Sequence, residues 1–194
     1  MNAFDVASAG DAGQLIYWLR HGEQLLEVRE DQQFRWLLLD GIVQSVLPRA
    51  QPSEICLPHQ RILQALMPAQ ARQVLHLGLG GGDMLRWLHH RYPDVQQTAV
   101  DLNAAILEIY QQFFRQEERP QLYCQDAFVW IKQAPTQYDL ILVDLFCDDG
   151  SPAPLFQPAS YQALQQCLAE NGKVIVNLLP RTEQEWQQVH LLLS

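Results

Sequence analysis

Apolar and polar positions follow one pattern in the first part of the chain and another in the rest. In the first part, short runs of apolar and aromatic residues are separated by polar turns, and Asp40-Gly41 is a strong hairpin signal. The pattern predicts a small antiparallel sheet with strands at residues 15–19, 25–29, 34–40 and 42–46. Several prolines then interrupt the chain. We therefore expect a small β domain and linker over residues 1–58.

From residue 59 onwards, apolar runs alternate with longer amphipathic segments. The runs predict strands at residues 74–78, 97–102, 121–125, 138–146 and 173–178. The segments predict helices at residues 59–66, 82–91, 104–116, 127–133, 158–169 and from residue 182. We expect Asn171-Gly172 to end the fifth helix, and Thr182 with Glu185 to form a capping box. Such alternation indicates an α/β fold with a parallel sheet over residues 59–194.

A glycine-rich turn, Gly78-Leu79-Gly80-Gly81-Gly82, joins the first of these strands to its helix. Glycine permits positive φ angles and lets a ligand approach the backbone. Asp101 ends the next strand, and an ionised acid accepts hydrogen bonds from both hydroxyls of a ribose. Together they predict a site for the nucleoside of a nucleotide-like cofactor. For the glycines alone, a tight turn without a ligand remains an alternative.

Two further aspartates, Asp126 and Asp144, follow the third and fourth predicted strands. Parallel strands present their carboxyl ends at one edge, where α/β sheets bind ligands. Each aspartate alone is also a common turn residue or helix N-cap, and for Asp126 the two interpretations weigh equally. Gathered at one edge, however, like charges cost energy unless a ligand supplies compensating donors. The set therefore favours a binding site.

Composition narrows the possible partners. The net charge of −9, without a cluster of Lys or Arg, argues against a nucleic-acid partner. No apolar run approaches the ~20 residues of a membrane span, and residues 1–5 do not resemble a signal peptide. The four cysteines lack paired spacing, so we expect neither a metal site nor a disulfide framework, and His76 is expected to be buried and neutral. These features predict a cytoplasmic protein that binds small molecules.

As a set, these motifs resemble those of the class I S-adenosylmethionine-dependent methyltransferase fold. More narrowly, they resemble the spermidine synthase (polyamine aminopropyltransferase) family and its less defined relatives. The resemblance covers about residues 25 to 180 and rests on four stretches: Leu38–Ser45 with its Leu-Asp-Gly-x-x-Gln pattern, the glycine turn leading to Leu85-Arg86, the loop Asp144–Pro152, and Leu155-Phe156 with Tyr161.

The resemblance implies S-adenosylmethionine or its decarboxylated form as cofactor, a small amine or polyamine as acceptor, and a possible homodimer. It implies that Asp144 is catalytic, accepting a proton from the attacking amine or orienting it. It also assigns cofactor-binding roles by position: Gly78, Gly80 and Gly82 to the methionine-derived tail and ribose, Asp101 to the ribose hydroxyls, Asp126 and Ala127 to the adenine, and Gln44 to the tail.

The chain departs from the family pattern at two acidic positions. Aligned from the first strand, the aspartate of the family's Gly-Gly-Gly-Asp-Gly-Gly motif falls on Gly81, and Asp83 comes two residues late. The second acid of the fourth-strand loop is replaced by Cys147, with Asp148 one residue late. A neutral thiol cannot pair with an ammonium group as a carboxylate does. The last two strands of the fold are also expected to be missing.

Three hypotheses follow. The first is a spermidine synthase-like transferase that moves an aminopropyl or methyl group from the cofactor to a small amine. The second is a catalytically inactive scaffold or partner subunit, which Gly81, Cys147 and the short C-terminal region favour. The third is a nicotinamide-dependent dehydrogenase, which shares the glycine turn and the ribose-binding acid.

Overall fold

The computed structural model describes residues 3–147 and 150–193, which form two compact units built from interleaved segments of the chain. Unit 1 contains Met1–Met67, Leu79–Asp94 and Asn103–Arg119. Unit 2 contains Pro68–Gly78, Val95–Leu102 and Pro120–Ser194. The expected domain boundary at residue 58 remains a prediction.

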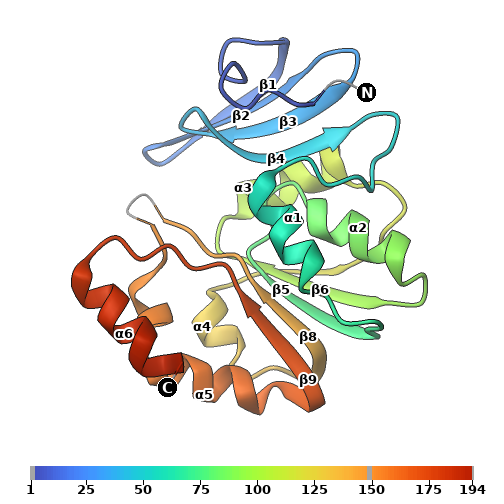
Figure 1. Ribbon diagram of the computed structural model, residues 1–194. Helices are drawn as coiled ribbons and strands as arrows, with labels where there is room; N and C mark the ends of the chain where they lie inside the picture. The colour runs from blue at the N-terminus through green and yellow to red at the C-terminus, as the bar shows by residue number, and fades with distance from the viewer. Residues whose placement is uncertain (1–2, 148–149, 194) are drawn as a thin grey trace. The chain divides into compact units, whose positions relative to one another are not determined.

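Unit 1 contains the predicted antiparallel sheet (Figure 1). Its four strands lie in the order β1-β2-β3-β4: β1 (Gln14–His21), β2 (Gln24–Glu30), β3 (Phe34–Leu39) and β4 (Ile42–Pro48). Asp40 and Gly41 have φ angles of 48° and 78°, so the two-residue loop between β3 and β4 is the tight hairpin that the sequence predicted. One apolar cluster on this sheet contains Ala9, Phe34, Trp36, Leu38, Val46 and Leu57.

The helices of unit 1 are α1 (Pro58–Ala65), α2 (Asp83–Arg91), α3 (Ala104–Ile109) and the π-helical turn η1 (Tyr110–Phe114). The prediction of a single α-helix over residues 104–116 is therefore wrong for its second half, which is a π-helical turn. Arg115 N donates to Tyr110 O at 2.8 Å, which widens the last turn. The carbonyls of Phe113 and Phe114 accept side-chain hydrogen bonds from Arg35 and Arg86, so the helix has no need of a further turn to satisfy them.

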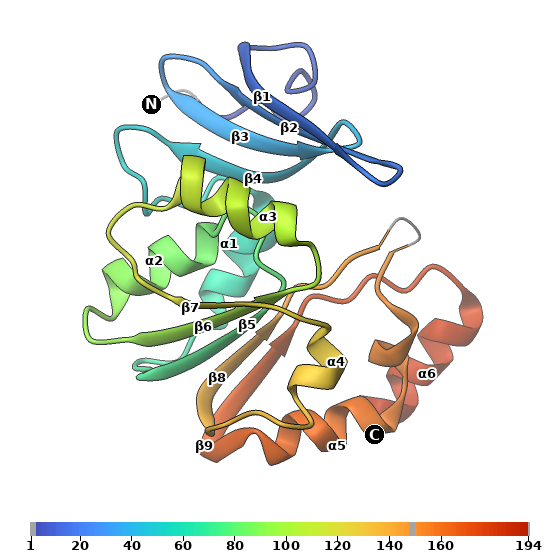
Figure 2. The same ribbon diagram turned by 180° about the vertical axis from the view of Figure 1, so that it is seen from behind.

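Unit 2 contains a parallel five-stranded sheet in the order β7-β6-β5-β8-β9 (Figure 2). Its strands are β5 (Gln73–Leu77), β6 (Gln96–Asp101), β7 (Gln121–Cys124), β8 (Tyr138–Val143) and β9 (Leu168–Val176). The helices of this unit are α4 (Ala127–Trp130), the 3-10 helix η2 (Ala153–Phe156), α5 (Pro158–Gln166) and α6 (Glu183–Leu193). The predicted α/β architecture is confirmed.

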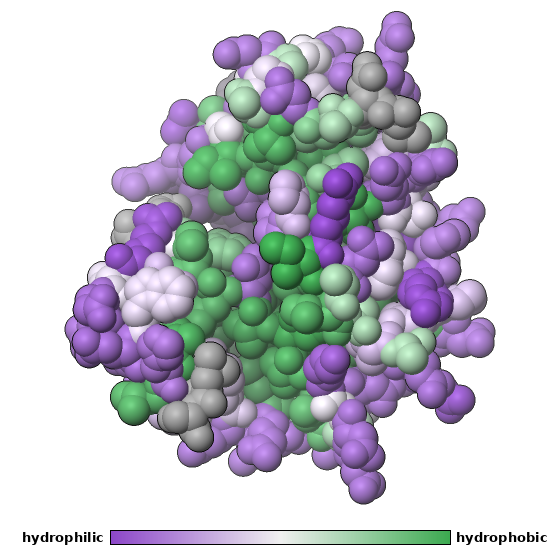
Figure 3. All heavy atoms as spheres, in the orientation of Figure 1, coloured by the Kyte–Doolittle hydropathy of each residue, from purple (hydrophilic) through white to green (hydrophobic). Residues whose placement is uncertain are grey.

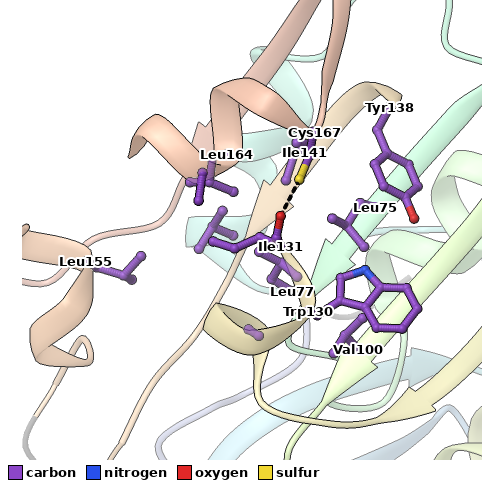
Figure 4. Close-up of a cluster of buried hydrophobic side chains, with 13 residues drawn as sticks. Leu75, Leu77, Val100, Trp130, Ile131, Tyr138, Ile141, Leu155, Leu164 and Cys167 are labelled. Carbon is purple, nitrogen blue, oxygen red and sulfur yellow. Dashed lines mark hydrogen bonds between the residues drawn. The ribbon is translucent and has the colours of Figure 1, made fainter. Parts of the chain in front are cut away.

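The core of unit 2 lies between this sheet and the helices α4 and α5 (Figure 4). The strands contribute mostly aliphatic side chains, and the helical segments add Trp130 of α4, Ile131 directly after it and Leu164 of α5. The Sγ of the buried Cys167 donates to Ile131 O at 2.8 Å (Figure 4). Burial raises the pKa of this thiol, so Cys167 stays protonated and fills the core.

The start of β9 differs from the prediction. The helix α5 ends at Gln166 rather than at residue 169, and β9 begins at Leu168, which pairs with Tyr138. Asn171 has a φ of 61° and lies within the strand, where the register with β8 is irregular. An Asn-Gly pair tolerates positive φ equally well in a helix stop and in a bulge, so the local signal could not distinguish the two.

The helix α6 begins with the predicted capping box. Glu185 N donates to Thr182 Oγ1 at 3.1 Å, and Thr182 N donates to Glu185 Oε2 at 3.1 Å. In the face of the molecule shown in Figure 3, hydrophilic side chains predominate over α6. Among the described residues, no helix is both long and apolar enough to cross a membrane.

His76 lies within β5 and is 4% exposed, with Nε2 at 2.9 Å from Gln97 Oε1. Burial lowers its pKa from 6.5 to about 4, so the ring is neutral at physiological pH, as the sequence suggested.

This buried histidine predicts a loss of stability in mild acid. Because its pKa is lower in the folded than in the unfolded state, the unfolded chain binds more protons as the pH falls below about 6.5. At pH 5 we expect a loss of about 2 kcal/mol in the free energy of unfolding, at ~1.4 kcal/mol per pH unit. The His76→Gln variant should lack this loss when urea unfolding is compared at pH 7 and pH 5. An equal loss in both proteins would show that another group is responsible.

Candidate functional site

The carboxyl edge of the parallel sheet in unit 2 brings together four of the predicted site residues. Gly78 follows β5, Asp101 ends β6, Asp126 follows β7, and Asp144 follows β8. The ends of these strands are joined by backbone hydrogen bonds from Gly78 N to Val100 O at 2.9 Å and from Asp144 N to Leu77 O at 2.9 Å. Each of the three aspartates is half-buried, so their carboxylates lie at the surface of this edge rather than in the core.

Gly78 is required by the close approach of β5 and β8. Its φ is 93°, and a Cβ at this position would overlap the carbonyl oxygen of Asp144. Any other residue would therefore push the ends of the two strands apart. The first glycine of the turn thus places Asp144 at the edge of the sheet.

The carboxylate of Asp144 accepts a hydrogen bond from Asn177 Nδ2 at 2.9 Å. Asn177 directly follows β9, and its own backbone N donates to Val143 O at 2.8 Å. The sequence analysis did not single out Asn177. The available signal was its position as a polar residue at the end of an apolar strand, where this fold places its binding residues.

Asp126 serves as the N-cap of α4, because its Oδ1 accepts a hydrogen bond from Val129 N at 2.9 Å. One of the two interpretations of Asp126 is thus confirmed, while its role at an adenine stays a prediction. Ala127, which shares that predicted role, is the buried first residue of α4.

A second residue missed from the sequence is Leu102, which follows Asp101 and is 72% exposed. An exposed apolar side chain beside a half-buried carboxylate suits a nucleoside, because the base needs an apolar surface and the ribose needs an acceptor.

The rest of the glycine turn lies in unit 1, beside β4. Gly81 N donates to Ser45 Oγ at 2.6 Å, and a Cβ at Gly81 would lie 2.7 Å from the Cβ of Ser45 and 3.0 Å from Phe114 Cδ1. Packing therefore excludes any side chain at Gly81, including the acid of the family motif. Gln44, the residue before Ser45, is half-buried and donates to Ile42 O at 3.4 Å.

Gly80 and Gly82 occupy the same part of unit 1. A Cβ at Gly80 would lie 2.9 Å from Ser45 Oγ, and one at Gly82 would lie 2.5 Å from the ring of Tyr110. Both glycines also have positive φ angles, of 52° and 72°. The predicted contacts of Gly80, Gly82 and Gln44 with the methionine-derived tail remain predictions.

Asp83 forms a buried ion pair with Arg86 inside unit 1, with 2.5 Å between Asp83 Oδ1 and the guanidinium. Asp83 Oδ2 accepts from Val46 N at 3.0 Å, and Arg86 also donates to the carbonyl oxygens of Gly81, Phe114 and Pro52. Burial raises the pKa of Asp83, and the attraction of Arg86 opposes that rise. The carboxylate of Asp83 is therefore buried and paired inside unit 1, and it does not replace the acid that is absent at Gly81.

The loop after β8 carries Cys147, which is exposed and whose Sγ donates to Gly150 O at 3.3 Å. Asp148 and Asp149 lie outside the described residues, so the displaced acid predicted at Asp148 stays a prediction. Among residues 3–147 and 150–193, no group of three or more His, Cys, Asp or Glu could hold a metal ion.

Comparison with known proteins finds curated relatives that are transferases. The chain is 28% identical over 157 residues to the polyamine aminopropyltransferase of Neisseria meningitidis serogroup A, a match that covers 77% of this chain and 60% of the relative. The chain thus matches only about three fifths of that relative's length.

Solved structures agree on the fold. A "probable spermidine synthase" from Corynebacterium glutamicum superposes with a TM-score of 0.73 at 20% identity, covering 85% of this chain and 64% of that one. Human methyltransferase-like protein 13, solved in complex with SAH, superposes with a TM-score of 0.62 at 26% identity and covers 71% of this chain and 72% of its own. The predicted methyltransferase-like sheet preceded by a small antiparallel sheet is confirmed.

A family model described as the spermine/spermidine synthase domain matches residues 61–190, which is more than half of the chain. The residues that carried the resemblance in the sequence lie largely within this range. The chain therefore belongs to the spermine/spermidine synthase family.

Proposed function

We propose that this protein binds S-adenosylmethionine or its decarboxylated form and transfers a methyl or aminopropyl group to a small amine. The observation that carries the proposal is the joint placement of Gly78, Asp101 and Asp144 at the carboxyl edge of one parallel sheet. The relatives support a transferase, because their descriptions name aminopropyl transfer and methyl transfer. They do not favour an inactive scaffold or a dehydrogenase.

The residues of unit 2 fit the nucleoside of such a donor. Asp101 supplies two acceptor oxygens for the ribose hydroxyls, and Leu102 supplies an exposed apolar surface next to them. Asp126 and Ala127 are assigned to the adenine. The half-buried aspartates also suit the positive charge of a sulfonium group.

Asp144 is the residue proposed to act in the reaction. The sulfonium of the bound donor supplies an activated carbon and a neutral thioether leaving group. The lone pair of the acceptor nitrogen forms a new C–N bond with that carbon. The C–S bond breaks at the same time, and the electron pair of that bond stays on sulfur. The nitrogen must also lose a proton, which the Asp144 carboxylate accepts while it holds the amine in line.

Binding by calorimetry tests the ribose role of Asp101. We expect S-adenosylmethionine, decarboxylated S-adenosylmethionine or methylthioadenosine to bind the protein. The Asp101→Ala variant should bind about 1–3 kcal/mol more weakly, because it loses charge-assisted hydrogen bonds to the ribose.

A matched control is Asp94→Ala, which changes an exposed aspartate in the turn two residues before the same strand and should leave affinity unchanged. Undiminished affinity in Asp101→Ala would refute the ribose role. Absence of heat with all three compounds would end the proposed function.

A further inference from the structure

We propose that Asn177 is a positioning residue for Asp144, which holds one oxygen of that carboxylate and leaves the second oxygen for the acceptor amine. The proposal deepens the function proposed for Asp144 and rests on it. It is carried by the contact between Asn177 Nδ2 and Asp144 Oδ1 at 2.9 Å and by the way the backbone holds both residues.

The backbone of Asp144 is held from two sides. Its N donates to Leu77 O at 2.9 Å, and its carbonyl lies against Gly78, where no Cβ would fit. Asn177 is held by the hydrogen bond from its own N to Val143 O at 2.8 Å. The two Cα atoms are thus placed by the ends of neighbouring strands, and the side-chain hydrogen bond then selects the orientation of the carboxylate.

The chemistry of the amide suits this role. An ionised carboxylate only accepts hydrogen bonds, so Asn177 must present its Nδ2 and not its oxygen. A neutral donor occupies one oxygen without neutralising the charge, whereas a lysine or arginine would compete with a cationic amine for it. The hydrogen bond from Asn177 therefore orients the carboxylate of Asp144 without neutralising it.

Loss of this contact should affect the reaction more than the binding of the donor. A misplacement of about 1 Å at a reacting group costs about 100-fold in rate, because the attack must be in line. Without its donor, the carboxylate of Asp144 can rotate about its side-chain torsions. We therefore expect kcat to fall while the KM for the donor stays nearly constant.

The first experiment tests the contact without requiring activity. In ¹⁵N-labelled protein, the side-chain amide signals of Asn177 are identified by their absence in Asn177→Leu. These signals should shift between acidic and neutral pH and should lose that shift in Asp144→Asn. Other charged or titratable groups of the neighbouring segments, which are Asp101, Asp126, Cys147 and Arg181, remain in that variant and serve as the internal control. An unchanged titration in Asp144→Asn would overturn the proposal.

The second experiment measures turnover with S-adenosylmethionine and decarboxylated S-adenosylmethionine against a panel of polyamines. We expect about a 10- to 100-fold lower kcat in Asn177→Leu, with the donor KM within about twofold, and partial recovery in Asn177→Gln, which keeps an amide donor. In the Asp144→Asn background, Asn177→Leu should have no further effect.

Equal losses from Asn177→Leu in both backgrounds, or no loss in the wild-type background, would refute the positioning role. A wild-type protein without turnover, combined with the expected amide shifts, would instead refute the proposed function and leave the contact established.

Discussion

The Asp144→Asn variant is expected to turn over about 100- to 10,000-fold more slowly than the wild type while binding the neutral nucleoside methylthioadenosine with unchanged affinity. This is the range by which a positioned general base accelerates proton transfer. Asparagine matches aspartate in size, and its oxygen can still accept the hydrogen bond from Asn177. The variant therefore removes the charge and the proton acceptor but preserves the geometry. Turnover of labelled donor with a polyamine panel gives kcat, and calorimetry with methylthioadenosine gives the affinity.

The matched control for this variant is Asp139→Asn, the same change in the same strand. Asp139 lies near the amino end of β8, where its Oδ2 accepts from Arg72 N at 2.8 Å and from Gln73 N at 2.9 Å. Asparagine keeps an acceptor there, so kcat should stay close to that of the wild type. If Asp144→Asn retained wild-type turnover, Asp144 would have no part in the chemistry.

The Arg86→Met variant is expected to lose about 3–5 kcal/mol of the free energy of unfolding, as is typical when one partner of a buried ion pair is removed. The loss has two sources. Asp83, which is 3% exposed, would keep a buried charge without its partner. The carbonyls of Gly81, Phe114 and Pro52 would also lose their donor. A domain has only about 5–15 kcal/mol in total, so this loss would remove a large share of its stability.

Urea unfolding followed by circular dichroism measures this effect. Arg91→Met is the matched control, because Arg91 lies on the same helix and is exposed. Its guanidinium lies over the Tyr92 ring at 5.3 Å from the ring centroid, so this variant should lose no more than about 1 kcal/mol. The double variant Asp83→Leu/Arg86→Met should be more stable than Arg86→Met, because it leaves no unpaired charge. Equal stability of Arg86→Met and Arg91→Met would show that the ion pair does not support the fold.

Short-range signals account for the elements that the sequence predicted well. The apolar run of β8, the Asp40-Gly41 hairpin and the capping box of Thr182 with Glu185 each depend on residues a few positions apart. The errors occur where a short-range signal had two solutions. Asn171-Gly172 lies in a strand rather than at a helix end, and the helix after Ala104 ends in a π-helical turn.

By itself, the sequence determined the α/β class, the glycine turn and the aspartates at the ends of the strands, because periodicity and spacing along the chain specify them. Only the tertiary structure decided which polar groups meet. Gly81 contacts Ser45 across 36 positions of the chain, and Asp144 contacts Asn177 across 33. Such pairs depend on which strands become neighbours in the folded protein. The packing around Gly81 leaves no room for a side chain, and the packing around Asp83 buries its carboxylate in the core. A local sequence pattern cannot specify these contacts, because they join residues that become neighbours only after the chain has folded.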